Sequence, residues 1–278
     1  MTVALFERTK EAVREAGRIA EQAFFAGDMH FDKKPDMTVV TLTDKAVEEN
    51  IVSFISKHFP EDSIIGEETG KRMNTSSFVW HIDPIDGTEN FLRRIPFFGI
   101  SVARLGDTPE GSFGMVYNPI TKQLFSSYKD AAGDMYENER VCKMTPDKLG
   151  SRYFINMGRR AREPWMKTAT FSIQKDLSLA YGRCWSMGCT SLELSYLAAN
   201  RIDGFITFGL DTYDYAAGLF LVRASGGKIS VFEGGQWLEW TGSIKALCEA
   251  PSPIIFASHP ETHEMFLKTI GDPTQRLT

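Results

Sequence analysis

Apolar and polar residues follow two different periods along this chain. In some stretches apolar side chains recur every three to four positions, which predicts amphipathic helices. The predicted helices cover residues 3–25, 44–59, 162–173, 191–200, 215–224 and 261–270. Other stretches are short, rich in β-branched and aromatic residues and bounded by turn residues, which predicts strands. The predicted strands cover residues 63–65, 78–82, 97–104, 113–117, 124–128, 134–136, 141–142, 152–156, 204–208, 228–232 and 254–257.

Capping and breaking residues support several of these boundaries. The second helix has Thr43 or Asp44 as a predicted N-cap, and Pro60 ends it. Residues 27–37, between the first two helices, are polar and rich in turn residues. Pro164 is tolerated because it falls in the first turn of its predicted helix.

The order of the elements predicts a mixed α+β and α/β fold. In the first half, short antiparallel strands pack on two helices, whereas the second half alternates strands with helices. A soft boundary near residue 145 divides one compact unit into an N-terminal half, residues 1–145, and a C-terminal half, residues 146–278. We expect the functional site between the two halves.

Composition excludes several classes of function. The 278 residues are 42% hydrophobic and 24% charged, with a net charge of −5, as in ordinary globular proteins. We expect no nucleic-acid partner, because there is no long basic tract, and no membrane partner, because no apolar stretch is long enough to span a bilayer. The four cysteines show neither metal-ligand spacing nor a disulfide framework. With no apolar signal core at the N-terminus, they favour a reducing, cytoplasmic location.

The most informative chemistry is concentrated in residues 83–91, Asp-Pro-Ile-Asp-Gly-Thr-Glu-Asn-Phe. Two carboxylates three positions apart, with a carbonyl between them, suit a hard cation such as Mg²⁺. The following glycine lets the backbone approach a ligand, and the next N–H groups can point at a phosphate. Asp-Pro and Asp-Gly are also common turn dipeptides, but turn chemistry explains acids at the end of a buried strand poorly.

Two further acidic clusters fit the same kind of site. Residues 63–68 form an apolar strand tip followed by Gly66 and two glutamates, and residues 211–218 place two aspartates at the start of an apolar helix. Taken separately, Glu67 and Glu68 are equally explained as solvated loop acids. Asp214 alone is equally explained as a helix N-cap.

Together the three clusters resemble the inositol monophosphatase family of metal-dependent, lithium-sensitive sugar phosphatases. The resemblance rests on Gly66-Glu67-Glu68, on Asp-Pro-Ile-Asp-Gly-Thr-x-Asn-Phe and on Tyr-Asp-Tyr-Ala-Ala-Gly followed by Gly-Gly, and it extends from the first helix to about residue 258. It implies a layered α-β-α-β-α sandwich, a hydrolase active on a small phosphorylated substrate, two or three Mg²⁺ ions, inhibition by lithium and a homodimer.

The resemblance also implies the metal ligands. Glu67, Asp83 and the carbonyl of Ile85 would hold a first ion. Asp83, Asp86 and Asp214 would hold a second, and Glu67 would share a third through waters.

Catalytic and phosphate-binding roles follow by the same resemblance. Thr88 with Glu67 would orient and deprotonate the attacking water, and the N–H groups of Gly87 and Thr88 would receive phosphate oxygens. Asp44 would steer the water network, unless it is only a helix N-cap.

The substrate side departs from the animal enzymes of the family. Thr207 stands where those enzymes grip inositol hydroxyls with a glutamate, and Asp211 stands where they carry a histidine. Cys189, in the loop 188–190, replaces a hydroxyl residue but is equally explained as an ordinary packed cysteine. The predicted substrate-binding residues are Asp86, Gly188, Cys189, Thr190, Thr207 and Asp211.

Two classes of function remain open from the sequence. The first is a Mg²⁺-dependent phosphomonoesterase that hydrolyses a small sugar or polyol phosphate such as inositol 1-phosphate. Alternative substrates are histidinol phosphate, fructose 1,6-bisphosphate and 3′-phosphoadenosine nucleotides, because one scaffold can serve several of them. The second class is a non-catalytic regulatory protein that keeps the fold and binds a partner.

Overall fold

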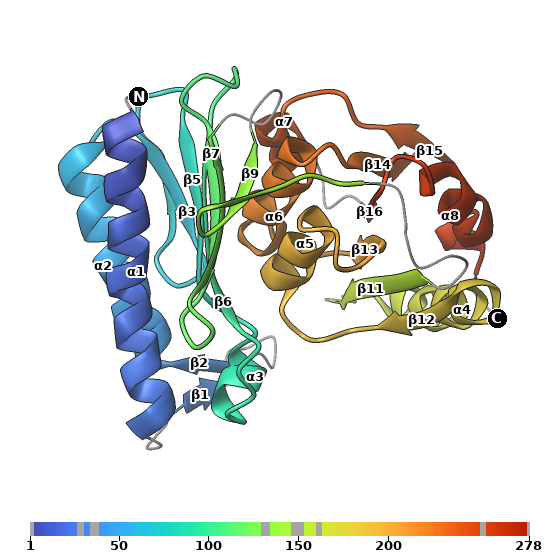
Figure 1. The fold of residues 1–278 in the computed structure, drawn as a ribbon, viewed down its shortest axis with the longest axis horizontal. Coiled ribbons are helices and arrows are strands. Elements are labelled where there is room, and N and C mark those ends of the chain that lie inside the picture. Colours follow the sequence, from blue (N-terminus) through green and yellow to red (C-terminus); the bar gives the residue numbers. More distant parts are fainter. Residues whose placement is uncertain are drawn as a thin grey trace.

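The chain folds into five layers in the order α-β-α-β-α (Figure 1). The computed structural model describes residues 3–26, 31–33, 39–128, 134–145, 153–159, 163–250 and 254–276. Helices α1 and α2 form one outer layer, and α4 and α8 lie at the opposite end of the molecule. The mixed, layered fold predicted from the sequence is therefore confirmed. Among the described helices, none is both long and apolar enough to cross a membrane.

The first layer consists of helices α1 (Val3–Ala26) and α2 (Leu42–His58). Their apolar faces pack on one side of the larger sheet, in a core that also holds Trp80. The predicted N-cap of α2 was wrong. Thr41 is the N-cap, and its hydroxyl accepts hydrogen bonds from the N–H groups of Thr43 and Asp44. Helix α2 therefore begins two residues earlier than the pattern indicated.

The second layer is an eight-stranded sheet in the order β10-β9-β8-β7-β6-β5-β3-β4. Its strands are β3 (Ser63–Gly66), β4 (Gly70–Arg72), β5 (Val79–Asp86), β6 (Gly99–Leu105), β7 (Phe113–Asn118), β8 (Gln123–Tyr128), β9 (Met135–Glu137) and β10 (Arg140–Cys142). All neighbours pair antiparallel except β3 and β5. Every residue of β5 is buried, because helices cover both faces of the sheet.

The middle layer consists of helices α5 (Thr190–Ala198) and α6 (Thr212–Ala224), between the two sheets. Most residues of both helices are buried, which explains why their pattern is largely apolar. The helices approach closely at Gly218, where an added Cβ would lie 2.5 Å from the Cβ of Leu194.

The second sheet has six strands in the order β12-β11-β13-β16-β14-β15. They are β11 (Tyr153–Arg159), β12 (Gly182–Trp185), β13 (Gly204–Phe208), β14 (Lys228–Glu233), β15 (Gln236–Glu239) and β16 (Ile254–Ser258). Helices α4 (Pro164–Tyr181) and α8 (His263–Ile270) cover its outer face, with the short η1 (Pro273–Gln275) after them. Helix α7 (Ile244–Glu249) packs beside α6.

Several short elements were not predicted from the sequence. The two-stranded sheet of β1 (Phe31–Lys33) and β2 (Val39–Thr41) lies partly in the stretch expected to be turns, and helix α3 (Thr88–Leu92) follows the acidic run. Strands β4, β12 and β15 and helix α7 were missed as well. Residues 27–30 and 34–37 of the expected turn-rich stretch, and residue 162 of the expected helix, lie outside the described residues.

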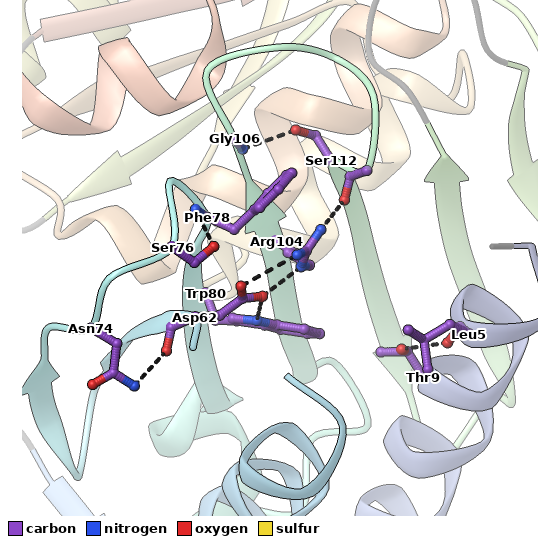
Figure 2. A network of polar contacts seen from close by, with 11 residues as sticks. Leu5, Thr9, Asp62, Asn74, Ser76, Phe78, Trp80, Arg104, Gly106 and Ser112 are labelled. Atoms are coloured by element: carbon purple, nitrogen blue, oxygen red, sulfur yellow. Dashed lines mark hydrogen bonds and ion pairs between the residues drawn. The ribbon is translucent and has the colours of Figure 1, made fainter. Parts of the chain in front are cut away.

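A buried ion pair fixes the start of β5, at the end away from the acidic run (Figure 2). The guanidinium of Arg104 donates to Asp62 from Nε at 2.7 Å and to the carbonyl of Gly111 at 2.7 Å. Asp62 also accepts the indole N–H of Trp80 at 2.9 Å. The Arg104 guanidinium stacks 3.5 Å from the ring centre of Phe78. These contacts join the loop before β3 to β5 and β6.

Candidate metal and phosphate centre

The acidic run Asp83–Asp86 lies within β5 rather than after it. In a regular strand, residues three apart point to opposite faces. Here the pairing with β6 shifts between Asp83, opposite Ser101, and Asp86, opposite Gly99, so β5 contains one extra residue. Such a bulge re-aims side chains, which explains how both aspartates can face the middle layer.

Hydrogen bonds within the bulge fix its shape. The N–H of Ile85 donates to Oδ1 of Asp83 at 3.1 Å. The hydroxyl of Thr88 donates to the carbonyl of Ile85 at 3.0 Å, so the residue predicted to orient the water lies beside a predicted metal ligand. Gly87 follows with φ +88°, a left-handed conformation that favours glycine, and it caps the N-terminus of α3.

The acids predicted to bind metal surround Asp83. Asp83 is 2% exposed, and its pKa is raised well above the usual range, chiefly by burial. The negative charges of Glu67, Asp86, Asp214 and Asp44 raise this pKa further. The structure therefore brings all the predicted carboxylate ligands and Asp44 close enough to repel one another, and a bound cation would offset that repulsion.

Glu67 comes from the loop after β3, and a buried residue of α2 fixes this loop. Glu48 is fully buried and accepts the N–H groups of Glu68 at 2.9 Å and of Thr69 at 2.7 Å. An added Cβ on Gly66 would lie 2.1 Å from Oε1 of Glu48, so this close approach requires glycine. The sequence analysis missed Glu48. The available signal was an acid four residues after Asp44 on the buried face of α2.

Asp44 is both a capping residue and a member of the acidic centre. Its Oδ2 accepts the N–H of Thr41 at 2.8 Å, which completes a capping box. Its Oδ1 is buried and has no hydrogen-bond partner among the described atoms. Burial raises the pKa of Asp44 to about 7 against the lowering effect of the Thr41 bonds. An unpartnered carboxylate oxygen here is suited to a cation or to water bound by one.

Asp214 reaches the centre from the start of α6. Asp211, and not Asp214, is the N-cap of this helix. The Oδ2 atom of Asp214 accepts the N–H of Asp211 at 2.9 Å, and Tyr213 donates its hydroxyl to Asp211 at 3.0 Å. The predicted substrate residue Asp211 therefore lies next to the predicted metal ligand Asp214.

Two contacts dock the start of α6 on the larger sheet. Nδ1 of His81, on β5, lies 2.8 Å from Oγ1 of Thr212, and Ser101 on β6 donates its hydroxyl to the carbonyl of Tyr213 at 3.2 Å. Burial lowers the pKa of His81 to about 3, so its ring is neutral near pH 7. His81, which the sequence left as either a core histidine or a partner of the site, positions the helix that carries Asp214.

The loop before α5 lies against the acidic run. An added Cβ on Gly87 would lie 3.0 Å from the carbonyl oxygen of Gly188 and 3.2 Å from the Cβ of Cys189. Sγ of Cys189 donates to Oδ2 of Asp86 at 3.3 Å, and the N–H of Ser191 donates to the same oxygen. Burial and the charge of Asp86 raise the pKa of the Cys189 thiol, which keeps it protonated. Gly188 and Cys189 therefore adjoin the predicted phosphate-binding turn.

Thr190 and Thr207 lie deeper in the C-terminal half. Thr207, on β13, is directly opposite Gly158 on β11, and Oγ1 of Thr190 lies 3.4 Å from the position of an added Cβ on Gly158. The hydroxyl of Thr207 is buried and has no hydrogen-bond partner among the described atoms. The structure thus places these two residues near each other, but it shows no bond from the Thr207 hydroxyl to the acids.

The donor set fits a hard divalent cation, because it consists of carboxylates and one backbone carbonyl. Among the residues that the structure describes, no three Asp, Glu, His or Cys side chains already stand close enough together to hold an ion. The acids repel one another, and Thr88 occupies one lone pair of the Ile85 carbonyl. A bound cation would offset this repulsion between the carboxylates.

The layered fold therefore carries the acidic motif in a bulge of β5, next to the glycine turn at Gly87. The model of the inositol monophosphatase family matches residues 4–274. The chain belongs to this family, and the prediction from the sequence is confirmed.

Relatives of this chain carry two kinds of names. "Nus factor SuhB" of Escherichia coli (strain K12) is 33% identical over 238 residues, covering 84% of this chain and 88% of that protein. The same-named protein of Haemophilus influenzae is 34% identical and covers 88% of this chain and 90% of its own length. The crystal structure of extragenic suppressor protein SuhB from Bartonella henselae has a TM-score of 0.83 at 25% identity, covering 96% and 98% of the two chains. The Thermotoga maritima IMPase has a TM-score of 0.82 at 22% identity over both full chains, which shows a shared fold.

Proposed function

We propose that this protein is a Mg²⁺-dependent phosphomonoesterase. The observation that carries the proposal is the gathering of Glu67, Asp86, Asp214 and Asp44 around the buried Asp83. A cluster of like charges in a desolvated position destabilises the fold unless a cation or a substrate uses it. Membership of the inositol monophosphatase family supports the same reaction class.

Residues of this chain would hold the ions as the sequence predicted. Glu67, Asp83 and the Ile85 carbonyl form one ligand set, and Asp83, Asp86 and Asp214 form a second. Two or three Mg²⁺ ions, when bound, would neutralise phosphate charge and make a nearby water more acidic. The Thr88 hydroxyl, which donates to the Ile85 carbonyl, would orient that water.

Neighbouring groups would accept the proton of the water and donate hydrogen bonds to the phosphate. Glu67, together with Thr88, would take the proton of the attacking water. The N–H groups of Gly87 and Thr88, at the start of α3, would donate to phosphate oxygens, and the left-handed turn at Gly87 fits beside the carbonyl of Gly188 because glycine has no Cβ. No covalent bond to a protein side chain is required.

The substrate proposed is a small sugar or polyol phosphate such as inositol 1-phosphate. Thr207 lacks the charged acceptor that would bind inositol hydroxyls and its own hydroxyl is buried, whereas Asp211 supplies an acid beside Asp214. Histidinol phosphate, fructose 1,6-bisphosphate and 3′-phosphoadenosine nucleotides are the alternatives. A structural neighbour is described as "Crystal structure of 2'AMP bound SaIMPase-II", with a TM-score of 0.74 at 24% identity, so we include nucleotides in the substrate panel.

A second candidate function is a regulatory role through a partner protein. The observation that favours it is the name "Nus factor SuhB" of relatives that cover 84% of this chain. The acidic centre is complete here, so this role would be additional to hydrolysis. Capture of a partner by wild type and by Asp83→Asn alike would support it, since partner binding would not need the metal site.

The experiment that tests the main proposal is phosphate release from a substrate panel, with and without Mg²⁺. The panel holds myo-inositol 1-phosphate, glucose 1-phosphate, fructose 1,6-bisphosphate, histidinol phosphate, 2′-AMP and 3′-phosphoadenosine 5′-phosphate. Hydrolysis that needs Mg²⁺ and disappears in Asp83→Asn is the expected result. Hydrolysis that persists in Asp83→Asn or in chelator would contradict the metal assignment.

Two further properties are proposed with this function, inhibition by lithium and a homodimeric state. Lithium would compete for a weakly held cation position, so phosphate release is measured across a lithium titration in the tens of millimolar range, roughly as expected for an exchangeable site. Sedimentation equilibrium measures the oligomeric state, and a monomer at micromolar concentration would exclude the dimer.

A further inference from the structure

Hydrogen bonds from both halves of the molecule hold the backbone of the loop at residues 187–189. On one side, Oε1 of Glu193, in α5, accepts the N–H groups of Met187 and of Gly188, the latter at 3.1 Å. On the other side, Nδ2 of Asn90, in α3, donates to the carbonyl of Met187 at 2.8 Å. Both backbone groups of Met187 are therefore fixed, one by each half.

The same asparagine also ties the loop to the segment before β6. Nδ2 of Asn90 donates to the carbonyl of Phe97 at 2.8 Å, so both of its amide protons are used. Gly188 has φ +79°, and an added Cβ there would lie 3.4 Å from Nδ2 of Asn90. The turn is consequently held in a left-handed conformation against α3.

The loop held by these hydrogen bonds is directly connected to a predicted metal ligand. Cys189 and Ser191, which follow Gly188, both donate to Oδ2 of Asp86. These two donors fix Oδ2 of Asp86, and neither of them bonds Oδ1. The position of the loop thus decides how Asp86 presents its carboxylate.

The carboxyl group of Glu193 is buried at a cost to the stability of the fold. It is 1% exposed, and burial raises its pKa to about 8, with the charge of Asp86 adding to the shift. The hydrogen bonds from Met187 and Gly188 only partly offset this effect. An apolar residue would suit the surroundings of α5 better, because its neighbours Leu192 and Leu194 belong to the central core.

We propose that Glu193 and Asn90 are positioning residues that set the divalent-cation affinity of the acidic centre by holding residues 187–189 against Asp86 and Gly87. This inference rests on the metal site of the proposed function. Neither residue belongs to the predicted metal-binding, catalytic or phosphate-binding set. Their effect passes through the backbone of Met187 and Gly188 to the donors that orient Asp86.

The test uses the full chain and Mn²⁺ as the probe, with binding measured by isothermal titration calorimetry. Glu193→Leu removes the acceptor, whereas Glu193→Gln keeps an acceptor oxygen of similar reach. Asn90→Asp keeps the shape of the side chain but removes both donors. Ser230→Ala is the control, because it removes a buried hydrogen bond to His263 in the outer part of the second half. Thermal unfolding of each variant confirms that it is folded at the temperature of the titration.

We expect Glu193→Leu and Asn90→Asp to raise the Kd for Mn²⁺ about 10-fold, as is typical when a residue that orients a metal ligand is lost. We expect Glu193→Gln and Ser230→Ala to stay within about 2-fold of wild type. If Glu193→Leu does not fold, the opposite results expected for Asn90→Asp and Glu193→Gln still test the inference.

Three results would overturn the inference. They are an unchanged Kd in Asn90→Asp or in folded Glu193→Leu, an equal loss in Glu193→Gln, or no Mn²⁺ binding by wild type. Turnover is measured separately across the substrate panel. Wild type that binds Mn²⁺ but hydrolyses nothing would refute the proposed activity while leaving the positioning of Asp86 testable, so the two failures are distinguishable.

Discussion

Removing the guanidinium of Arg104 tests whether the buried ion pair of Figure 2 fixes the larger sheet. In Arg104→Met, an unbranched apolar chain replaces the stem of the arginine, and the guanidinium that stacks on Phe78 is removed. The variant loses the bonds to Asp62 and to the carbonyl of Gly111. Asp62 then keeps the indole N–H of Trp80 but no counter-charge.

The expected loss of stability follows from the burial of both partners. The side chains of Arg104 and Asp62 are 8% and 5% exposed, so water cannot replace the missing guanidinium. Breaking such a pair from one side costs about 3–5 kcal/mol. In a chain of this size each kcal/mol lowers Tm by about 2–4 °C, so a fall of roughly 10 °C is expected. Replacing both partners, in Asp62→Leu with Arg104→Met, leaves no unpaired charge, and we expect a favourable coupling of about 2 kcal/mol or more between the two changes.

Urea unfolding, followed by near-ultraviolet circular dichroism, measures the free energy of unfolding of wild type, Arg104→Met, Asp62→Leu and the double variant. Divalent-cation binding, measured in parallel, should stay unchanged in the folded single variant, because the ion pair lies at the end of β5 away from Asp83 and Asp86. A loss below about 1 kcal/mol in Arg104→Met, or a double variant as unstable as the sum of the singles, would refute the reasoning.

The remaining predictions concern the acidic centre, a buried histidine and a glycine. Asp83→Asn should abolish Mg²⁺-dependent hydrolysis yet stabilise the metal-free protein by about 1 kcal/mol, because it removes one of several repelling charges; a thermal shift in chelator checks this, and a lower Tm would contradict it. Burial lowers the pKa of His263 to about 4, so its contribution to stability is complete above pH 6.5 and falls by about 3 kcal/mol as the pH drops toward 4. His263→Gln should flatten that part of the stability–pH curve, and an identical slope in both proteins would count against it. Gly66→Ala should cost about 1–3 kcal/mol and weaken Mn²⁺ binding, because its Cβ would displace Glu48; calorimetry and urea unfolding test both effects, and a variant like wild type would show that the loop adapts freely.

Periodicity predicted most of the long elements well because their burial is one-sided or complete over many residues, although α4 continues to Tyr181, beyond its predicted end at residue 173. Helix α1 and strand β7, for instance, lie where the pattern placed them. The short elements were missed for a physical reason. Strand β4 has only exposed residues, and β12 has one buried residue in four, so neither shows an alternation of apolar and polar positions.

Local sequence also set limits on the site. The motif around Asp83 indicated a cation and a phosphate, but the bulge that turns Asp83 and Asp86 toward one layer depends on the pairing with β6. Glu48 was missed because its partners, Glu68 and Thr69, lie about twenty residues away and bond through their backbone. A helix pattern contains no information on such contacts. The capping pattern at Thr41 was misread because an acid at N3 resembles an acid at the N-cap.

The acidic centre and its surroundings differ in what they contribute to the protein. The ion pair of Asp62 and Arg104 neutralises its own charges, so it stabilises the fold without any ligand. The acids around Asp83 do not, since each raises the pKa of that carboxyl. Contacts that neutralise nothing, such as His81 with Thr212 and Glu48 with the loop after β3, hold these acids in place. Repulsion among these acids lowers the free energy of unfolding, and a bound cation offsets it. The free energy of unfolding should therefore rise with free Mg²⁺, by about 2.7 kcal/mol at a hundred times the Kd.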